Sequence, residues 1–315
     1  MFALREIAVS LTFFVLLYCL LSALVAAVWR SLKLLRARHK NVADLLFGLR
    51  VLPLVASIAL TFIFVVPSFQ LLEPRAIDEG MGSTPLALGI CALVLIACGC
   101  FRVITAQTRT SRVVARWLDG APPLDAGSQT VTFRAQREAP PLTLVGIRKP
   151  RVLISESTVA LLSHDELQIA LKHERAHMQS RDNLKKLVVR LCPFPGMAAL
   201  ESAWAQAAEL AADDAAVSTQ DDAVDLAAAL VKLSRLVPVT AAPVCTVGFV
   251  TGSLSARVAR LLAWDQMEAE AGKAQQVRMR ARYAVPSVLA ALSLVFLGYG
   301  PVLALTHEVT EWLVR

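Results

Sequence analysis

The most informative stretch of this chain is LKHERAHM at residues 171–178, which contains the pattern HExxH. Residues four apart on an α-helix lie on the same face, so His173 and His177 can direct two imidazole nitrogens at one point. A zinc ion takes ligands of this kind. Glu174 is placed to act as a base on water rather than to bind the metal itself.

A helix start lies just upstream of this pattern. Ser163, followed three residues later by Glu166, forms the capping-box pattern, and Asp165 with Glu166 suits the positive end of a helix dipole. Neither proline nor glycine occurs between Ser163 and Ser180. The HExxH pattern is therefore predicted to lie in the middle of a helix.

The composition of the chain indicates a membrane protein. Of its 315 residues, 56% are apolar and only 18% are charged, and the net charge is +7. The six cysteines include no CxxC pair, so neither a cysteine zinc site nor a disulfide framework is expected.

Four apolar runs are long enough to cross a bilayer. We expect three transmembrane helices in residues 1–105, and a fourth with a short external tail in residues 283–315. The four predicted spans are about 7–28, 51–69, 85–101 and 283–305.

The basic residues give an orientation for these spans. Lys and Arg cluster between the first two spans, after the third and before the fourth, while the loop between spans two and three is acidic. The positive-inside rule then puts the N-terminus outside and residues 106–282 in the cytoplasm of a multi-pass protein of the cell (inner or plasma) membrane. The positive charge is accounted for by topology and anionic lipid, so direct nucleic-acid binding is not expected.

Residues 106–282 are predicted to form one soluble α+β domain. Short strand-like segments with alternating apolar residues occur at 130–133, 142–147 and 151–154. Helical patterns follow from Ser163 onward, and a small sheet followed by helices is typical of the α+β class.

Two histidines do not complete a catalytic zinc site, which takes three protein ligands and leaves one position open. A carboxylate is the expected third ligand, and Glu209 is the first choice, with Glu201 as the alternative. Asp213 lies four residues after Glu209 and could accept a hydrogen bond from a ligand histidine. The competing interpretation is that Glu209 and Asp213 belong to a solvated helix face.

Four motifs together resemble the BlaR/MecR-type membrane zinc metallopeptidases, which are related to the HtpX-like gluzincins. They are PRVLIS at 150–155, the HExxH pattern, RDNL at 181–184 and ELAADD at 209–214. The resemblance implies a zincin-like (gluzincin) domain that binds one zinc ion per chain. It assigns His173, His177 and Glu209 as zinc ligands, Glu174 as catalytic base and Asp213 as partner of a ligand.

The same resemblance leaves Asp182 either as a second partner of the ligands or as a helix cap. Receptors of that family carry a penicillin-binding sensor after the last span, and this sequence stops at Arg315. β-Lactam sensing is therefore not expected, and any sensor would be a separate partner.

The leading functional hypothesis is an endopeptidase at the cytoplasmic face that cleaves itself or a transcriptional repressor in regulated proteolysis. An alternative is HtpX-like quality control of membrane proteins. A third possibility, from a different class, is a non-catalytic signalling scaffold with a structural zinc.

Overall fold

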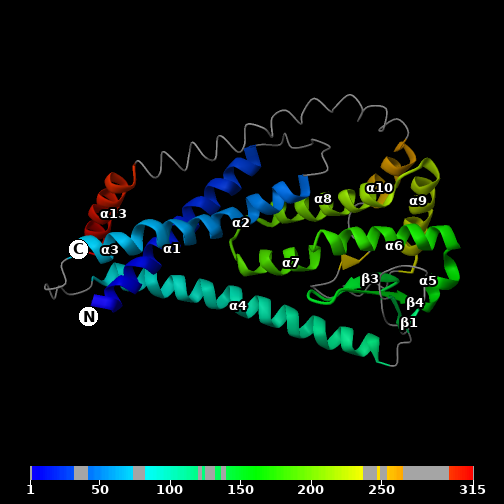
Figure 1. The fold of residues 1–315 in the computed structure, drawn as a ribbon, viewed down its shortest axis with the longest axis horizontal. Coiled ribbons are helices and arrows are strands. Elements are labelled where there is room, and N and C mark those ends of the chain that lie inside the picture. The colour runs from blue at the N-terminus through cyan, green and yellow to red at the C-terminus, as the bar shows by residue number, and fades with distance from the viewer. Residues whose placement is uncertain are drawn as a thin grey trace. The chain divides into compact units, whose positions relative to one another are not determined.

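The computed structural model describes most of the chain (Figure 1). The described residues are 2–31, 42–73, 82–119, 123–124, 132–135, 140–236, 247–248, 254–264 and 298–314. The chain divides into two compact units. One comprises Met1–Lys33, Val51–Cys98 and Ala269–Arg315, and the other comprises Leu34–Arg50 and Gly99–Glu268.

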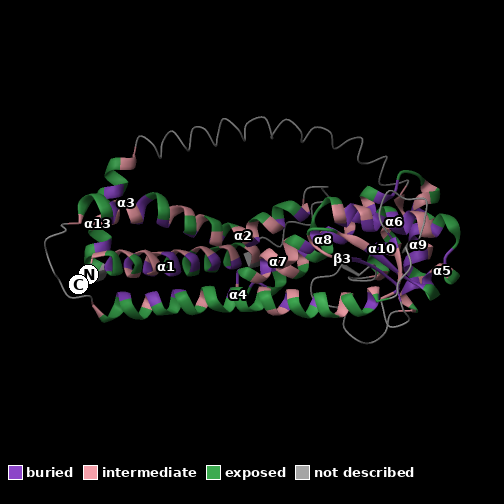
Figure 2. Cartoon of the chain, turned by 60° about the horizontal axis from the view of Figure 1, so that its bottom comes forward, coloured by how far each residue is buried: buried purple, intermediate pink, exposed green. Residues whose placement is uncertain are grey.

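Long apolar helices dominate the first unit. Three described helical segments are long and apolar enough to cross a membrane: Phe2–Trp29, Val42–Leu72 and Ser83–Leu118. They contain the three N-terminal spans that the sequence predicts. Exposed residues run along their length in Figure 2, and many of them are large and apolar, as expected for surfaces that face lipid. The chain therefore has the helices of a membrane protein.

The helices that contribute to this unit run as follows: α1 (Phe2–Ser31), α2 (Val42–Leu60), the π-helix η1 (Thr61–Val65), α3 (Val66–Leu72), α4 (Ser83–Leu118) and α13 (Tyr299–Val314). The third predicted span and the residues that follow it as far as Leu118 form one continuous helix, α4. Most of the fourth predicted span, 283–305, lies outside the described residues, which resume at residue 298.

The second unit contains a five-stranded sheet in the order β1-β2-β4-β3-β5. Its strands are β1 (Pro123–Leu124), β2 (Thr132–Ala135), β3 (Leu142–Val145), β4 (Arg151–Ser155) and β5 (Val247–Gly248). β2 runs parallel to β4, whereas β3 pairs antiparallel with both β4 and β5. The sequence predicts β2, β3 and β4 but not the two-residue outer strands.

Helices follow the sheet and build the core of this unit. They are α5 (Glu156–Leu161), α6 (His164–Gln179), α7 (Asp182–Leu191), α8 (Ala198–Ala216), α9 (Gln220–Ser234) and α10 (Leu254–Leu262). Leu226, Leu230 and Leu233 repeat at helical spacing along α9 and are completely buried. They share one hydrophobic cluster with Ile169 of α6 and Leu144 of β3. This cluster fixes α6 between the sheet and α9.

Arg50 differs from a simple sequence-based expectation. As a basic residue at the edge of an apolar run, it should reach toward the lipid headgroups. It lies instead inside α2, is only 2% exposed, and its Nε donates to Glu201 Oε1 at 2.9 Å. It also donates to the carbonyl of Cys192. A buried guanidinium needs such partners because leaving it unpaired would cost several kcal/mol (roughly 3–5).

Candidate functional site

The helix that carries the HExxH pattern starts as the sequence predicts. Ser163 Oγ accepts from the Glu166 backbone N–H at 3.2 Å, and Glu166 Oε2 accepts from the Ser163 N–H at 2.8 Å, so the capping box is confirmed. Lys232 of α9 donates to both Glu166 oxygens at 2.7 Å. These contacts anchor the first turn of α6 and thereby set the position of the histidines two to three turns later.

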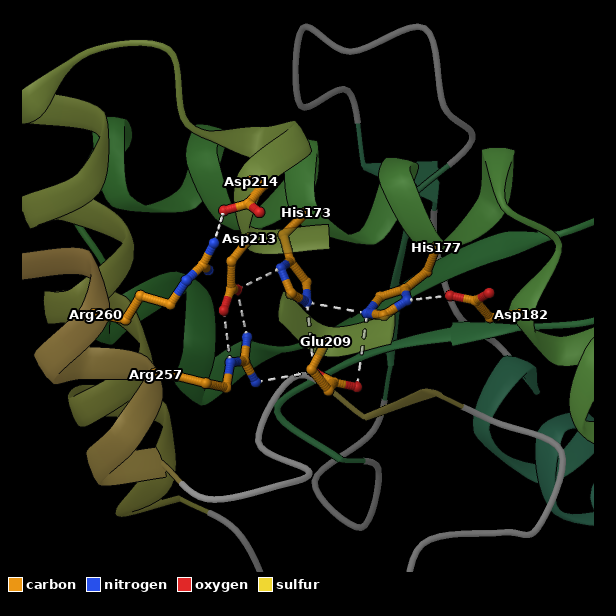
Figure 3. A network of polar contacts seen from close by, with 8 residues as sticks. All are labelled: His173, His177, Asp182, Glu209, Asp213, Asp214, Arg257 and Arg260. Atoms are coloured by element: carbon orange, nitrogen blue, oxygen red, sulfur yellow. Dashed lines mark hydrogen bonds and ion pairs between the residues drawn. The ribbon is translucent and has the colours of Figure 1, made fainter. Parts of the chain in front are cut away.

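Three possible metal ligands converge on one point (Figure 3). Nε2 of His173 and Nε2 of His177 are 3.1 Å apart, and each lies 3.7 Å from an oxygen of Glu209. Four tetrahedral ligands at zinc bond lengths are separated by about 3.3 Å, so these spacings match a shared ion closely. The two histidines come from α6 and Glu209 from α8, which pack against each other. All three residues are buried.

The other nitrogen of each imidazole faces a carboxylate. His173 Nδ1 lies 3.0 Å from Asp213 Oδ1, and His177 Nδ1 lies 2.6 Å from Asp182 Oδ2. When Nδ1 donates to a carboxylate, Nε2 carries the lone pair that a metal needs. Two imidazole lone pairs and the Glu209 carboxylate then face one another, an arrangement that a bound metal ion would satisfy. The donor set therefore fits a metal ion.

The protonation states of these groups reflect burial and charge together. Burial lowers the pKa of His173, and the charges of His177 and Arg257 lower it further, whereas the hydrogen bond that His173 donates to Asp213 opposes the shift. For His177, burial acts downward, but Asp182, Glu209 and Glu174 together raise the pKa. Metal binding requires neutral imidazole, so a metal must displace any proton held on His177.

Asp213 is held as a carboxylate. Burial favours its neutral form, yet hydrogen bonds and charge from His173 and Arg257 lower the pKa of Asp213 to about 2. An ionised Asp213 accepts from His173 Nδ1 and so favours the tautomer in which Nε2 is free to bind.

Glu174 occupies the buried side of α6 next to the first histidine. Its side chain is 0% exposed, and neither carboxylate oxygen has a hydrogen-bond partner among the residues that the structure describes. Burial raises the pKa of Glu174 to about 8; Glu209 adds to the shift, while His177 opposes it. A carboxylate with this pKa readily takes up a proton near neutral pH.

The structure adds Arg257 of α10, which the sequence reasoning missed. Its guanidinium is 3% exposed and donates to Asp213 Oδ1 and Oδ2 at 2.6 and 2.8 Å and to Glu209 Oε2 at 2.8 Å. Arg260, one turn later, pairs with Asp214. Two arginines three residues apart on an otherwise apolar helix were the available signal, but nothing in the sequence matches them to the acidic residues of α8.

A tight turn between α6 and α7 places Asp182. Arg181 adopts a left-handed conformation with φ of 55°, and the next residue, Asp182, places Oδ2 2.6 Å from His177 Nδ1. Asn183 donates to the carbonyls of Leu144 and Gly146 at 3.2 and 3.1 Å, so the turn is attached to the end of β3. Asp182 is the first residue of α7 rather than its N-cap.

Two other sequence candidates lie away from this centre. Glu201, the alternative third ligand, pairs with Arg50 and is not among the three convergent ligands. The sequence also led us to expect that an extended substrate could pair with an exposed edge strand within residues 130–154, and the sheet order contradicts this. β1 pairs with β2 and β5 pairs with β3, so strands from outside that range form both edges of the sheet.

One family of known proteins matches this chain. A search of curated proteins finds no match. The family model described as BlaR1 peptidase M56 matches residues 95–261, which is more than half of the chain and contains the histidine pair, Glu174 and Glu209. The chain has helices suited to a membrane and a buried group of possible metal ligands, as a membrane metallopeptidase requires. The chain belongs to the BlaR1 peptidase M56 family.

Proposed function

We propose that this chain is an integral-membrane zinc endopeptidase that hydrolyses peptide bonds of a protein substrate at the cytoplasmic face. The observation that carries the proposal is the convergence of His173, His177 and Glu209 at 3.1–3.7 Å beside the buried Glu174. Two histidines and one glutamate are a donor set of catalytic zinc sites, which leave one coordination position open. One ion per chain is expected.

The described residues favour catalysis over a purely structural metal. A structural zinc site is closed by four protein ligands, whereas three converge here among the residues that the structure describes. The zinc ion, when bound, supplies Lewis-acid activation of water and of the scissile carbonyl. Glu174 then serves as the proton carrier: its carboxylate accepts a proton from the attacking water and passes it to the leaving amide nitrogen.

The protein itself holds these groups in place. Asp182 and Asp213 orient the two imidazoles, and Arg257 holds Glu209 through its Oε2 atom while both oxygens of Glu209 remain near the histidines. Because each orienting group is buried, the ligands are fixed before substrate arrives, and little reorganisation is needed during reaction.

The pairing of β3 with β5 supports an extended peptide substrate. Thr143 and Leu144 of β3 pair antiparallel with Gly248 and Val247. β3 contacts α6, and its end is attached to the turn that carries Asp182. A peptide added to a sheet edge obtains main-chain hydrogen bonds without sequence restriction. Either β5 belongs to a segment that the enzyme cleaves in its own chain, or another protein replaces it.

Regulated proteolysis of the chain itself or of a cytoplasmic transcriptional repressor is the biological role that we propose. The basic clusters beside the spans support a catalytic unit on the cytoplasmic side of the cell membrane, with the N-terminus outside. A separate sensor protein is a further expected partner. The three candidate spans before the catalytic helix favour this role over HtpX-like quality control.

The deciding experiment uses Glu174→Gln in the full-length protein. The variant should retain bound zinc, because Glu174 is not a ligand, but its cleavage rate should fall by about 10²–10⁴-fold through loss of the proton carrier. Glu156→Gln removes an exposed carboxylate from α5 and is the matched control, which should cleave normally. The proteomes of cells that carry Glu174→Gln and of cells that carry Glu156→Gln are then compared. A substrate regulator should remain uncleaved only in the cells with Glu174→Gln. Normal cleavage by Glu174→Gln would exclude the assigned role.

A further inference from the structure

A second cluster of carboxylate and imidazole groups lies in the unit that contains the membrane helices. Glu73 is the residue at the C-terminal end of α3, and His307 and Glu311 lie four apart on α13. α13 packs against α3 and η1 (Figure 1). One possible ligand atom from each of the three residues lies within 4.8 Å of the other two. The cluster shares no residue with the HExxH centre.

The imidazole of His307 lies between the two carboxylates without bonding to either. Its Nδ1 is 4.0 Å from Glu73 Oε2, and its Nε2 is 3.7 Å from Glu311 Oε1. Both distances exceed hydrogen-bond range, and they involve different nitrogens of the ring, so a single ion could take only one of these nitrogens together with the two carboxylates. Nδ1 of His307 is buried and has no hydrogen-bond partner in the described part of the chain. Closing the group around one ion requires the imidazole to turn so that one nitrogen faces both carboxylates, and the Glu311 side chain, which is 46% exposed, has room to follow it.

An arginine holds one carboxylate of the cluster. Arg5 of α1 pairs with Glu73 Oε1 at 3.0 Å, and both side chains are about 10% exposed. The arginine therefore orients Glu73 through one oxygen, while the other oxygen faces His307. One imidazole and two carboxylates are ligand types that transition-metal ions accept.

We propose that Glu73, His307 and Glu311 form a second metal site, which takes Zn²⁺ or a similar transition-metal ion with affinity for imidazole and carboxylate. The ion joins the C-terminal end of α3 to α13. Since α3 continues the second candidate span, metal binding at this point stabilises the contact between that span and α13 by mass action. Under the orientation proposed above, the site lies on the outer side and would respond to external metal.

The number of bound ions tests this site. Full-length protein in detergent is stripped of metal with a chelator and titrated with Zn²⁺ in a calorimeter. The wild type should bind two ions and His307→Ala only one. Glu311→Gln should weaken the second binding event more than about tenfold, because a charged ligand is lost. Glu308→Gln changes the exposed neighbour of His307 and should still bind two ions.

Failure here is distinguishable from failure of the proposed peptidase. His173→Ala removes a ligand of the first centre only and should leave the His307-dependent ion in place. If His173→Ala binds one ion fewer than wild type while His307→Ala binds as many ions as wild type, then His307 holds no metal ion, and this inference alone is overturned. Equal stoichiometry in wild type and His307→Ala would also overturn it. The inference is supported if wild type binds two ions and His307→Ala binds one and still cleaves.

Discussion

Replacing Arg257 by methionine tests the charge arrangement around the metal ligands. The change keeps an unbranched side chain of similar length but removes the guanidinium that contacts Asp213 and Glu209. These carboxylates are 0% and 5% exposed, so neither can recover its lost partner from solvent. Removal of one member of a buried ion pair costs about 3–5 kcal/mol. At about 2–4 °C per kcal/mol for a unit of this size, the unfolding midpoint should fall by roughly 6–20 °C.

Thermal unfolding followed by tryptophan fluorescence, in metal-free detergent solution, measures this effect. Arg260→Met is the matched control on the same helix, because the ion pair between Arg260 and Asp214 is more exposed, with side chains 15% and 20% accessible. It should lower the midpoint less than Arg257→Met does, because both partners of this pair keep some contact with solvent. Adding metal should make the fall in the unfolding midpoint of Arg257→Met smaller, because a bound cation offsets the repulsion between the carboxylates of Glu209 and Asp213. Equal midpoints for the two variants would refute the assignment of Arg257 as the buried counter-charge.

Three further changes probe other parts of the catalytic unit. Asp182→Asn removes the carboxylate that orients one ligand histidine, so equilibrium dialysis should show metal affinity lowered by about 10–100-fold; unchanged affinity would contradict that role. Burial opposes ionisation of Glu166, but hydrogen bonds from Lys232 and the Ser163 backbone lower the pKa of Glu166 below 4.5. The ionised Glu166 therefore stabilises the folded state above that pH, and this contribution is lost as the pH falls further. Glu166→Gln can still accept from the Ser163 backbone, and its melting midpoint should fall less with pH in this acid range than that of wild type. Identical pH profiles would argue against the ion pair between Glu166 and Lys232. Leu230→Ala should cost about 2–5 kcal/mol in unfolding experiments, whereas Val231→Ala, at a 38% exposed position of the same helix, should cost far less.

Features that depend on neighbouring residues were predictable from the sequence. The capping box at Ser163 and Glu166 involves residues three apart, and the leucines of α9 follow the period of one helix. The three N-terminal spans are long apolar runs, and their described helices contain them. In each case the interaction that stabilises the element lies within the element or with lipid, so no distant partner has to be known.

Features that depend on distant partners were missed or misjudged. β5 lies about 100 residues after β3 in the chain, and two residues carry no periodicity that would identify a strand. Arg50 looked like an interfacial residue, because its partners Glu201 and Cys192 are about 150 residues away. The role of Arg257 could not be predicted for the same reason, because it depends on contacts with Asp213 and Glu209, which are distant in the sequence.

The sequence by itself determined the apolar spans, the helix that bears HExxH and the choice of candidate ligands, because these follow from local spacing and composition. Only the tertiary structure decided which carboxylates meet the histidines. It set Glu209 against both Nε2 atoms, Asp182 and Asp213 behind the rings and Glu201 away at Arg50. The physical reason is that a metal site is formed by groups on separate helices, and their approach depends on how α6, α8 and α10 pack around one core.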